Sequence, residues 1–453
     1  MRNIIDKAFT AAFLTIAVSS FSHGETLNEI YQQALQNDHQ FRAAKAAYLA
    51  GKEEKNRGRA GLLPQVVGTA NKTEGELEES GTRFNQPVNT DPADSESTLY
   101  QVVLTQPLFD MAAWHTYQRG KLDSKVAHAE YEAARQLLIR RVAEAYLNVL
   151  LAVDNFETAR AEENANSHQL EQTRKRFEVG LTAITDVHEA QASYDNSLAR
   201  RLLQEGNVGI AFEALEVITG HSYRYLAPLK EDFPINPPSP IDREEWVQFS
   251  MDNNFTLAAA SLRSKSSQQS AKIARAGHLP TVEANLSYSD SNDVNNFSNV
   301  DRTSSGVSID LRLPIFSSGG VSATRRQAAQ RYYEAKENYL QARRDTIQNA
   351  RSSHLTVVTD VATVKARRQA ITSSQSALEA TQAGYEVGTR DLVDVLIAQR
   401  TLYTAQRDYS DSLYTYIQDT LRLKEVAGIL TEKDIVELDN WLDTSRQVNR
   451  EIQ

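Results

Sequence analysis

Hydrophobic residues recur at every third or fourth position along two very long stretches of the chain, about 111–205 and about 320–428. None of the 11 prolines falls in either stretch, and an interior proline would break a helix. The spacing is that of a coiled-coil stripe, so both stretches are predicted to be helical arms. Representative stripe positions are Leu122, Val126, Ala129, Ala133 and Leu137, and later Tyr332, Ala335, Tyr339 and Ala342.

Each arm is interrupted once, by a Val-Gly pair that contains Gly180 or Gly388. Glycine readily adopts the left-handed conformation that ends a helix, so each arm is expected to turn back as a helical hairpin. The predicted tips are about 179–185 and about 387–393. An ascending helix of about 70 residues would be roughly 100 Å long, which is more than a globular domain needs.

A period of two replaces the helical period between the arms. Val282, Ala284, Leu286 and Tyr288 alternate with polar residues, and "GVSIDLRLPIF" alternates in the same way. We therefore expect two β-hairpins, about 64–109 and about 280–316. This alternation is typical of outer-membrane strands and equally of half-buried soluble strands. The alternation is weakest in "PQVVGTANKT", and the polar stretches 71–97 and 289–305 are expected to be loops.

The chain is internally duplicated. "RAGLLPQV" recurs as "RAGHLPTV", and "FEVGLTAITDVHEAQ" recurs as "YEVGTRDLVDVLIAQ" about two hundred residues later. Each repeat is predicted to contain a helix, a β-hairpin and a long helical hairpin. The boundaries are 25–230 for the first repeat, 231–242 for a proline-rich linker, 243–430 for the second repeat and 431–453 for a C-terminal segment.

Composition and targeting signals restrict the function. The formal net charge of −10 argues against a nucleic-acid partner, because a phosphate backbone needs clustered Lys and Arg. Residues 1–24 resemble a secretory signal peptide, with Arg2 and Lys7 before a short apolar run. The chain has no cysteine and therefore no disulfide. No apolar run approaches the roughly 20 residues of a transmembrane helix, so insertion into a membrane would require a β-barrel.

Four strands cannot close a barrel, because the smallest transmembrane barrels have about eight. The chain must therefore oligomerise, as a dimer with eight strands or a trimer with twelve. Catalytic motifs such as H-E-x-x-H, G-x-S-x-G and the Walker loop are missing, and the nine histidines show no ligand spacing. We expect no enzymatic activity, no cofactor and no metal.

The chain resembles the outer-membrane efflux proteins of Gram-negative bacteria over essentially its whole mature length. The stretches that carry the resemblance are "RAGLLPQV", "LTQPLFD", "AYLNVLLAVD" and the two Val-Gly motifs. The resemblance implies a mostly α fold with membrane-spanning β-strands. The chain would form a homotrimer in outer-membrane lipid, in which the three protomers together build one 12-stranded barrel. A coiled-coil helical tunnel would continue the barrel across the periplasm, with the linker and the C-terminal segment forming an equatorial belt.

The function implied by the resemblance is that of a passive exit duct for drugs, toxins or proteins. Its partners would be a periplasmic adaptor and, through the adaptor, an inner-membrane RND or ABC transporter. A non-conducting structural or adhesive coiled coil that spans the periplasm is the alternative. The opposite polarity of the two strand faces and the presence of two Val-Gly motifs favour the duct.

The resemblance also assigns site residues. Thr185 and Asp186 would bond Tyr385 and Arg390, within one protomer and across to its neighbour, and hold the periplasmic gate shut. Asp394 would form a carboxylate ring, whereas Ile397 stands where the family has a second aspartate, so cation selectivity and block should be weak. The adaptor-docking tips would be Val179, Gly180, Leu181, Thr182, Val387, Gly388, Thr389 and Arg390. A simpler alternative is that these motifs only stop one helix and start the next.

Aromatic residues mark the junction of strands and helices. Phe109 and Phe316 occupy equivalent positions in the two repeats, and Trp114 lies close to the first. Aromatic residues gather at membrane edges, which predicts a membrane-interface site. Core packing at the junction is the alternative.

Overall fold

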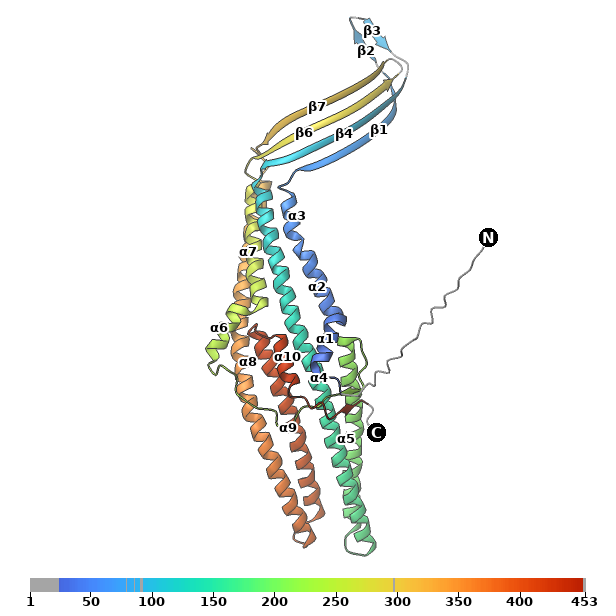
Figure 1. The fold of residues 1–453 in the computed structure, drawn as a ribbon, viewed down its shortest axis with the longest axis vertical. Coiled ribbons are helices and arrows are strands. Elements are labelled where there is room, and N and C mark those ends of the chain that lie inside the picture. Colours follow the sequence, from blue (N-terminus) through green and yellow to red (C-terminus); the bar gives the residue numbers. More distant parts are fainter. Residues whose placement is uncertain (1–23, 79, 85, 90–92, 296–297, 451–453) are drawn as a thin grey trace, which may run out of the picture.

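The computed structural model describes residues 24–78, 80–84, 86–89, 93–295 and 298–450. The molecule is elongated, with a curved sheet at one end and long helices that extend away from it (Figure 1). The predicted signal peptide lies outside the described residues except for Gly24. None of the helices in the described part of the chain is long and apolar enough to cross a membrane.

Two helices dominate the molecule, and each is the next helix after a strand of the main sheet. Helix α4 contains 68 residues and α8 contains 67, so each is roughly 100 Å long. The Asp110 carboxylate caps the start of α4 by accepting a hydrogen bond from the Ala113 amide at 2.9 Å. The helices are α1 Leu27–Asn37, α2 His39–Lys52, α3 Glu54–Ala60, α4 Met111–Glu178, α5 Ile184–Thr219, α6 Arg243–Asn253, α7 Phe255–Ala276, α8 Gly320–Glu386, α9 Leu392–Val426 and α10 Glu432–Asp439.

The main sheet is antiparallel and has the strand order β1-β4-β6-β7. Its strands are β1 Gln65–Leu77, β4 Ala93–Phe109, β6 Thr281–Asn295 and β7 Ser298–Arg312. The short strands β2 Ser80–Arg83 and β3 Gln86–Asn89 form a separate hairpin beyond it.

The expectation of polar loops at 71–97 and 289–305 is wrong, because the strands continue through most of both segments. Polar side chains there bond across the ladder. Ser289 and Ser304 are 2.8 Å apart, and the Thr303 hydroxyl donates to Asp290 at 3.1 Å. A ladder of backbone bonds thus outweighs the low strand preference of these residue types.

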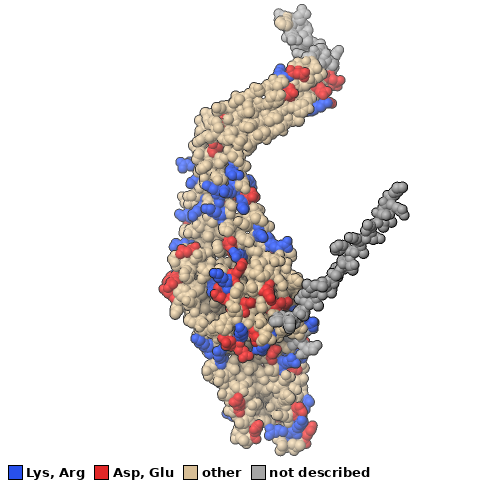
Figure 2. All heavy atoms as spheres, viewed as in Figure 1, with Lys and Arg blue, Asp and Glu red and all other residues tan. Residues whose placement is uncertain are grey.

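The register places an apolar stripe that runs across all four strands on one face. Leu286 lies opposite both Val307 and Leu104, and Leu104 lies opposite Val66. Cross-strand partners share a face of a sheet, so the other face carries polar residues such as Asn285 and Asp310. Lys and Arg, Asp and Glu are sparse over most of the sheet and gather towards its far end (Figure 2).

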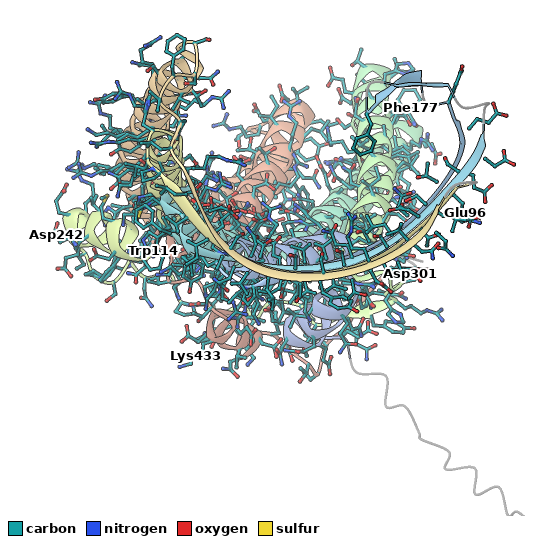
Figure 3. The ribbon with its side chains drawn as sticks, turned by 90° about the horizontal axis from the view of Figure 1, so that it is seen from above. Glu96, Trp114, Phe177, Asp242, Asp301 and Lys433 are labelled. Atoms are coloured by element: carbon teal, nitrogen blue, oxygen red, sulfur yellow. The ribbon has the colours of Figure 1, made fainter. Side chains whose placement is uncertain are left out.

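Seen from above, the sheet is an arc rather than a flat layer (Figure 3). By the strand register, Glu96 and Asp301 lie on the same face of the sheet as the apolar residues, and both are at the convex side of the arc. Lys433 of α10 also lies on the convex side. The apolar strand face is therefore the outer face of the arc, and the polar strand face lines its hollow.

Small elements surround the long helices at mid-height (Figure 1). The end of the first repeat, just before the linker, meets the C-terminal segment there: β5 Tyr225–Leu226 pairs with β8 Val448–Asn449, and the Lys230 amide donates to the Trp441 carbonyl at 2.9 Å. The buried Tyr146 hydroxyl of α4 donates to the Ala227 carbonyl at 2.6 Å. This belt and the middle of α4 share the largest hydrophobic core of the described residues.

Candidate functional site at the helical tips

The two Val-Gly turns form the end of the molecule that lies opposite the sheet (Figure 1). Gly180 and Gly388 have φ angles of +77° and +78°, a conformation that costs glycine little and other residues more. Each turn closes with a backbone bond, from Leu181 to Arg176 at 2.8 Å and from Thr389 to Gly384 at 2.9 Å. The motif is therefore repeated because both hairpins use the same backbone turn.

The turns present aliphatic side chains to solvent. Val179, Leu181 and Val387 are 69%, 71% and 76% exposed. A helix stop requires only the glycine, so these three side chains are not explained by the turn. Exposed aliphatics at the end of a rigid hairpin suit contact with another protein.

A hydrophobic cluster behind the turns joins the two hairpins. Leu170, Ala190 and Leu392 are buried in it, and Tyr385 packs against them. The Arg176 guanidinium lies 4.8 Å from the centre of the Tyr385 ring, a cation–π contact between α4 and α8. The sequence analysis missed Arg176, whose partner is more than two hundred residues away.

The gate residues make local bonds in the single chain. Asp186 accepts hydrogen bonds from the hydroxyls of Thr182 and Thr185, and Arg390 contacts Asp394 at 3.4 Å, one turn along α9. Within this chain, whose tips are fully described, no hydrogen bond or ion pair joins Thr185 or Asp186 to Tyr385 or Arg390. The expected bond within a protomer is not formed here, because Asp186 and Arg390 find partners in their own turns. Tyr385 instead contacts Arg176 of α4. The bond between protomers stays a prediction.

The remaining tip residues have clear places. Asp391 caps α9 by accepting a hydrogen bond from the Asp394 amide at 2.9 Å, as the helix-start alternative expects. Ile397 is 47% exposed, one turn beyond Asp394. An apolar side chain therefore follows the carboxylate along α9, with no second charge at that level.

A buried ion pair ties the hairpins together above the tips. Glu162 is 1% exposed, and its carboxylate accepts from Arg200 at 2.7 Å and from Arg407 at 3.1 Å. These residues lie on α4, α5 and α9, and we call them the Glu162 clasp. The sequence analysis missed it, although a glutamate at the stripe spacing between Ala159 and Asn166 was an available signal.

A cleft of about 500 Å³ opens beside the Glu162 clasp. Glu162 and Asn166 line it from α4, Arg200 from α5 and Ile397 from α9. The two hairpins are therefore in contact at the tip cluster and at the clasp but are separated between these levels.

Two carboxyl groups at mid-height have raised pKa values. Burial raises the pKa of Asp154 to about 6, and the Tyr414 hydroxyl, which donates to it at 2.8 Å, partly opposes that shift. Burial and the neighbouring carboxylate of Asp419 raise the pKa of Asp360 to about 6. In the described residues no group of acidic and histidine side chains has the geometry to hold a metal ion.

The junction aromatics are at the surface. Phe109, Trp114 and Phe316 are 43%, 45% and 85% exposed in one chain, which disfavours the core-packing alternative. Trp114 lies at the convex side of the sheet (Figure 3).

Comparison with known proteins identifies relatives along the whole chain. Residues 30–221 and 246–429 match the model of the family described as outer membrane efflux protein. The chain is 34% identical to outer membrane protein TolC of Vibrio cholerae, over 99% of this chain and 100% of that protein. It is 30% identical to the proteases secretion protein PrtF of Dickeya chrysanthemi, over 97% of this chain and 96% of that protein. The crystal structure of CusC matches with a TM-score of 0.77 at 17% identity, over 89% of this chain and 92% of that one.

Proposed function

Since the chain belongs to the outer membrane efflux protein family, we propose that three copies close into one duct through the outer membrane and across the periplasm. The duct is the passive exit of tripartite efflux pumps and of type I secretion systems. Its wall would consist of 12 strands in lipid, continued by the long helices. An inner-membrane transporter must supply the energy, because the chain lacks a nucleotide-binding motif.

The observation that carries the proposal is the open, curved sheet. Within the described residues, β1 and β7 each pair with another strand on one side only. The convex face of the sheet is apolar. Unpaired backbone groups are costly in hydrocarbon, so spanning strands have to close into a barrel. Repeating the arc gives each edge strand a partner and places the polar face in the lumen.

The tips are the proposed docking site of a periplasmic adaptor. Val179, Leu181 and Val387 offer apolar contacts, and Thr182, Thr389 and Arg390 surround them with polar groups. Six such tips would form the periplasmic end of the trimer. The adaptor links them to an RND or an ABC transporter; similarity to TolC and to a protease secretion protein supports both uses.

The gate lies just inside the tips. We infer that Thr185 and Asp186 of one protomer meet Tyr385 and Arg390 of the next, and that three Asp394 carboxylates surround the constriction. Docking at the tips would break these contacts and open the duct. Arg-to-carboxylate bonds of this kind are individually modest, but a threefold set would open in one cooperative step.

Photo-crosslinking in living cells tests the docking proposal. A photoreactive residue at Thr389 is expected to capture an adaptor, identified by mass spectrometry, whereas one at the exposed Glu437 of the belt serves as the control. Capture of only neighbouring subunits at Thr389 would reject the tips as a docking surface. An adaptor from an efflux pump, an adaptor from an ABC system, or both, would identify the cargo route.

Conductance of the purified protein in a planar bilayer tests the duct itself. The proposal expects ion conductance that depends on the trimer. A trimer that inserts but never conducts, even with the gate bonds removed by Arg390→Ala, would instead support a structural or adhesive coiled coil.

A further inference from the structure

Positive side chains gather immediately below the sheet, although the chain as a whole has a formal net charge of −10. Lys and Arg are concentrated there on the convex side, on the parts of α4, α7 and α8 next to the strands (Figure 2). The function proposed above makes no use of this charge.

The centre of this region is a groove of about 690 Å³ formed by three helices. His115 lines it from α4, Lys272 and Arg275 from α7, and Arg325 from α8. His278 and Leu279, which follow α7, complete its edge. We call this set of residues the basic groove.

No negative charge neutralises the basic groove. Its lining contains no Asp or Glu, and no ion pair formed within the described residues involves Lys272, Arg275 or Arg325. Several cations in one groove repel one another unless an anion lies between them. The groove is therefore suited to a ligand with a compact negative charge.

Apolar side chains lie at the edge of the basic groove and between it and the sheet. Ile315 and Phe316, in the connection from β7 to α8, are 92% and 85% exposed, and Leu279 and Trp114 are also exposed. The order from the strands downward is an apolar outer face, then aromatic and aliphatic side chains, then cations. Membrane proteins have this order where hydrocarbon gives way to headgroups, because aromatic rings stay at the boundary and cations reach the phosphates.

We propose that the basic groove binds the phosphate headgroup of an anionic glycerophospholipid in the periplasmic leaflet of the outer membrane. Arg275 and Arg325 present planar guanidinium groups that match phosphate oxygens, and Lys272 adds a point charge. The acyl chains would lie upward along Leu279, Ile315 and Phe316. These apolar neighbours favour a lipid over free phosphate as the occupant.

The inference rests on the outer-membrane position in the proposed function but not on export. Bound lipid would fix the height of the barrel in the bilayer, since the groove lies at the base of the strands. Cations near a charged membrane surface each add to the attraction for anionic lipid, so three of them are sufficient for selective binding.

Native mass spectrometry of the purified trimer with phosphatidylglycerol and phosphatidylcholine of identical acyl chains provides the test. The wild type should retain phosphatidylglycerol at least about tenfold better than phosphatidylcholine. That ratio is the size of effect expected from two or more surface cations. The neutralised variant should lose that preference, whereas the control should keep it. The neutralised variant is Lys272→Gln, Arg275→Gln, Arg325→Gln, and the control is Arg343→Gln, Arg344→Gln, Lys365→Gln.

The control removes the same charge from α8 at a distance, because Arg343 lies roughly 27 Å beyond Arg325 along that helix. The proposal is wrong if the neutralised trimer still prefers phosphatidylglycerol. It is also wrong if inorganic phosphate at the same concentration displaces the lipid, because the groove would then be a free-anion site.

The spectrum also reports the trimer mass. If the triple variant does not assemble, the single variants Lys272→Gln and Arg325→Gln replace it, and each is expected to lose part of the preference. Conductance should be unchanged in every assembled variant. A trimer that binds lipid selectively but does not conduct would therefore reject the duct and keep the lipid site.

Discussion

Glu162 shows how one charged side chain can hold two helical hairpins together. Its carboxylate is almost completely withdrawn from water and is shared by Arg200 and Arg407. Removing one member of a buried pair is costly because the remaining charges keep their desolvation penalty.

We expect Glu162→Gln to lower the free energy of unfolding of the helical hairpins by about 3 kcal/mol, since both guanidinium groups lose their counter-charge. Thermal unfolding followed by circular dichroism measures the change. Glu171→Gln is the control, because Glu171 forms an exposed pair with Lys175 at 2.6 Å and should change the midpoint little. Equal midpoints for the two variants would mean that the clasp does not stabilise the hairpins.

Two glycine-to-alanine changes should have opposite effects on local stability. An added Cβ would meet no atom at either Gly388 or Gly206. The two differ in backbone conformation, because Gly388 has a positive φ whereas Gly206 lies inside helix α5. Gly388→Ala should destabilise its turn by about 1 kcal/mol, and Gly206→Ala should stabilise α5 by roughly 0.5–1 kcal/mol. Hydrogen exchange of peptides from the tip and from α5 measures both. Slower exchange at the tip of Gly388→Ala would contradict the backbone explanation of the repeated motif.

At the scale of elements, α4 and α9 meet through a carboxyl group whose ionisation opposes folding. Asp154 on α4 and Tyr414 on α9 are hydrogen-bonded in the core of the belt. Burial raises the pKa of Asp154 from an ordinary 3.8 to about 6. Between these values the unfolded chain has already released a proton that the folded chain still holds, so the free energy of unfolding falls as the pH rises.

Asp154→Asn should therefore be more stable than the wild type at neutral pH, by about 3 kcal/mol, with the difference vanishing near pH 4. Thermal unfolding at several pH values measures it. Asp443→Asn serves as the comparison, and its effect on stability should have the opposite sign, because hydrogen bonds from Ser445 lower the pKa of Asp443. That variant should be less stable than the wild type at neutral pH, with the difference lost on acidification. A pH-independent effect of Asp154→Asn would show that Asp154 titrates normally in the folded protein.

At the scale of the whole molecule, the proposed constriction would be formed by three copies of α9. Asp394 and Ile397 lie one turn apart on that helix, so side chains at these positions share a face. With a single carboxylate ring, block by multivalent cations is expected to be weak.

Ile397→Asp adds a second carboxylate ring and should lower the half-blocking concentration of a trivalent cation, added from the periplasmic side, by roughly tenfold or more. Single-channel recording in a planar bilayer measures the block. Ile184→Asp is the matched control, because Ile184 and Ile397 are both 47% exposed, and it should change the block much less. The same shift in both variants would place Ile397 outside the constriction.

The sequence alone specified the elements with a strong local period. Two arms without proline, their turns at Gly180 and Gly388 and the apolar alternation of β6 and β7 all follow from neighbours within a few residues. The duplication and the family motifs then implied how the copies assemble. The outer face of the sheet was predictable for the same reason, since alternation determines which side chains share a face.

Only the tertiary structure decided which distant groups meet. Polar segments expected as loops became strands because ladder partners come from elsewhere in the chain, as the Ser97 hydroxyl shows by donating to Asp293 of the other segment. Asp186 bonds within its own turn rather than with Arg390, Glu162 joins three helices, and the basic groove combines side chains from α4, α7 and α8. Local periodicity determines the direction in which a side chain points along its own element. Its partner depends on how the elements pack, and the sequence pattern does not contain that information.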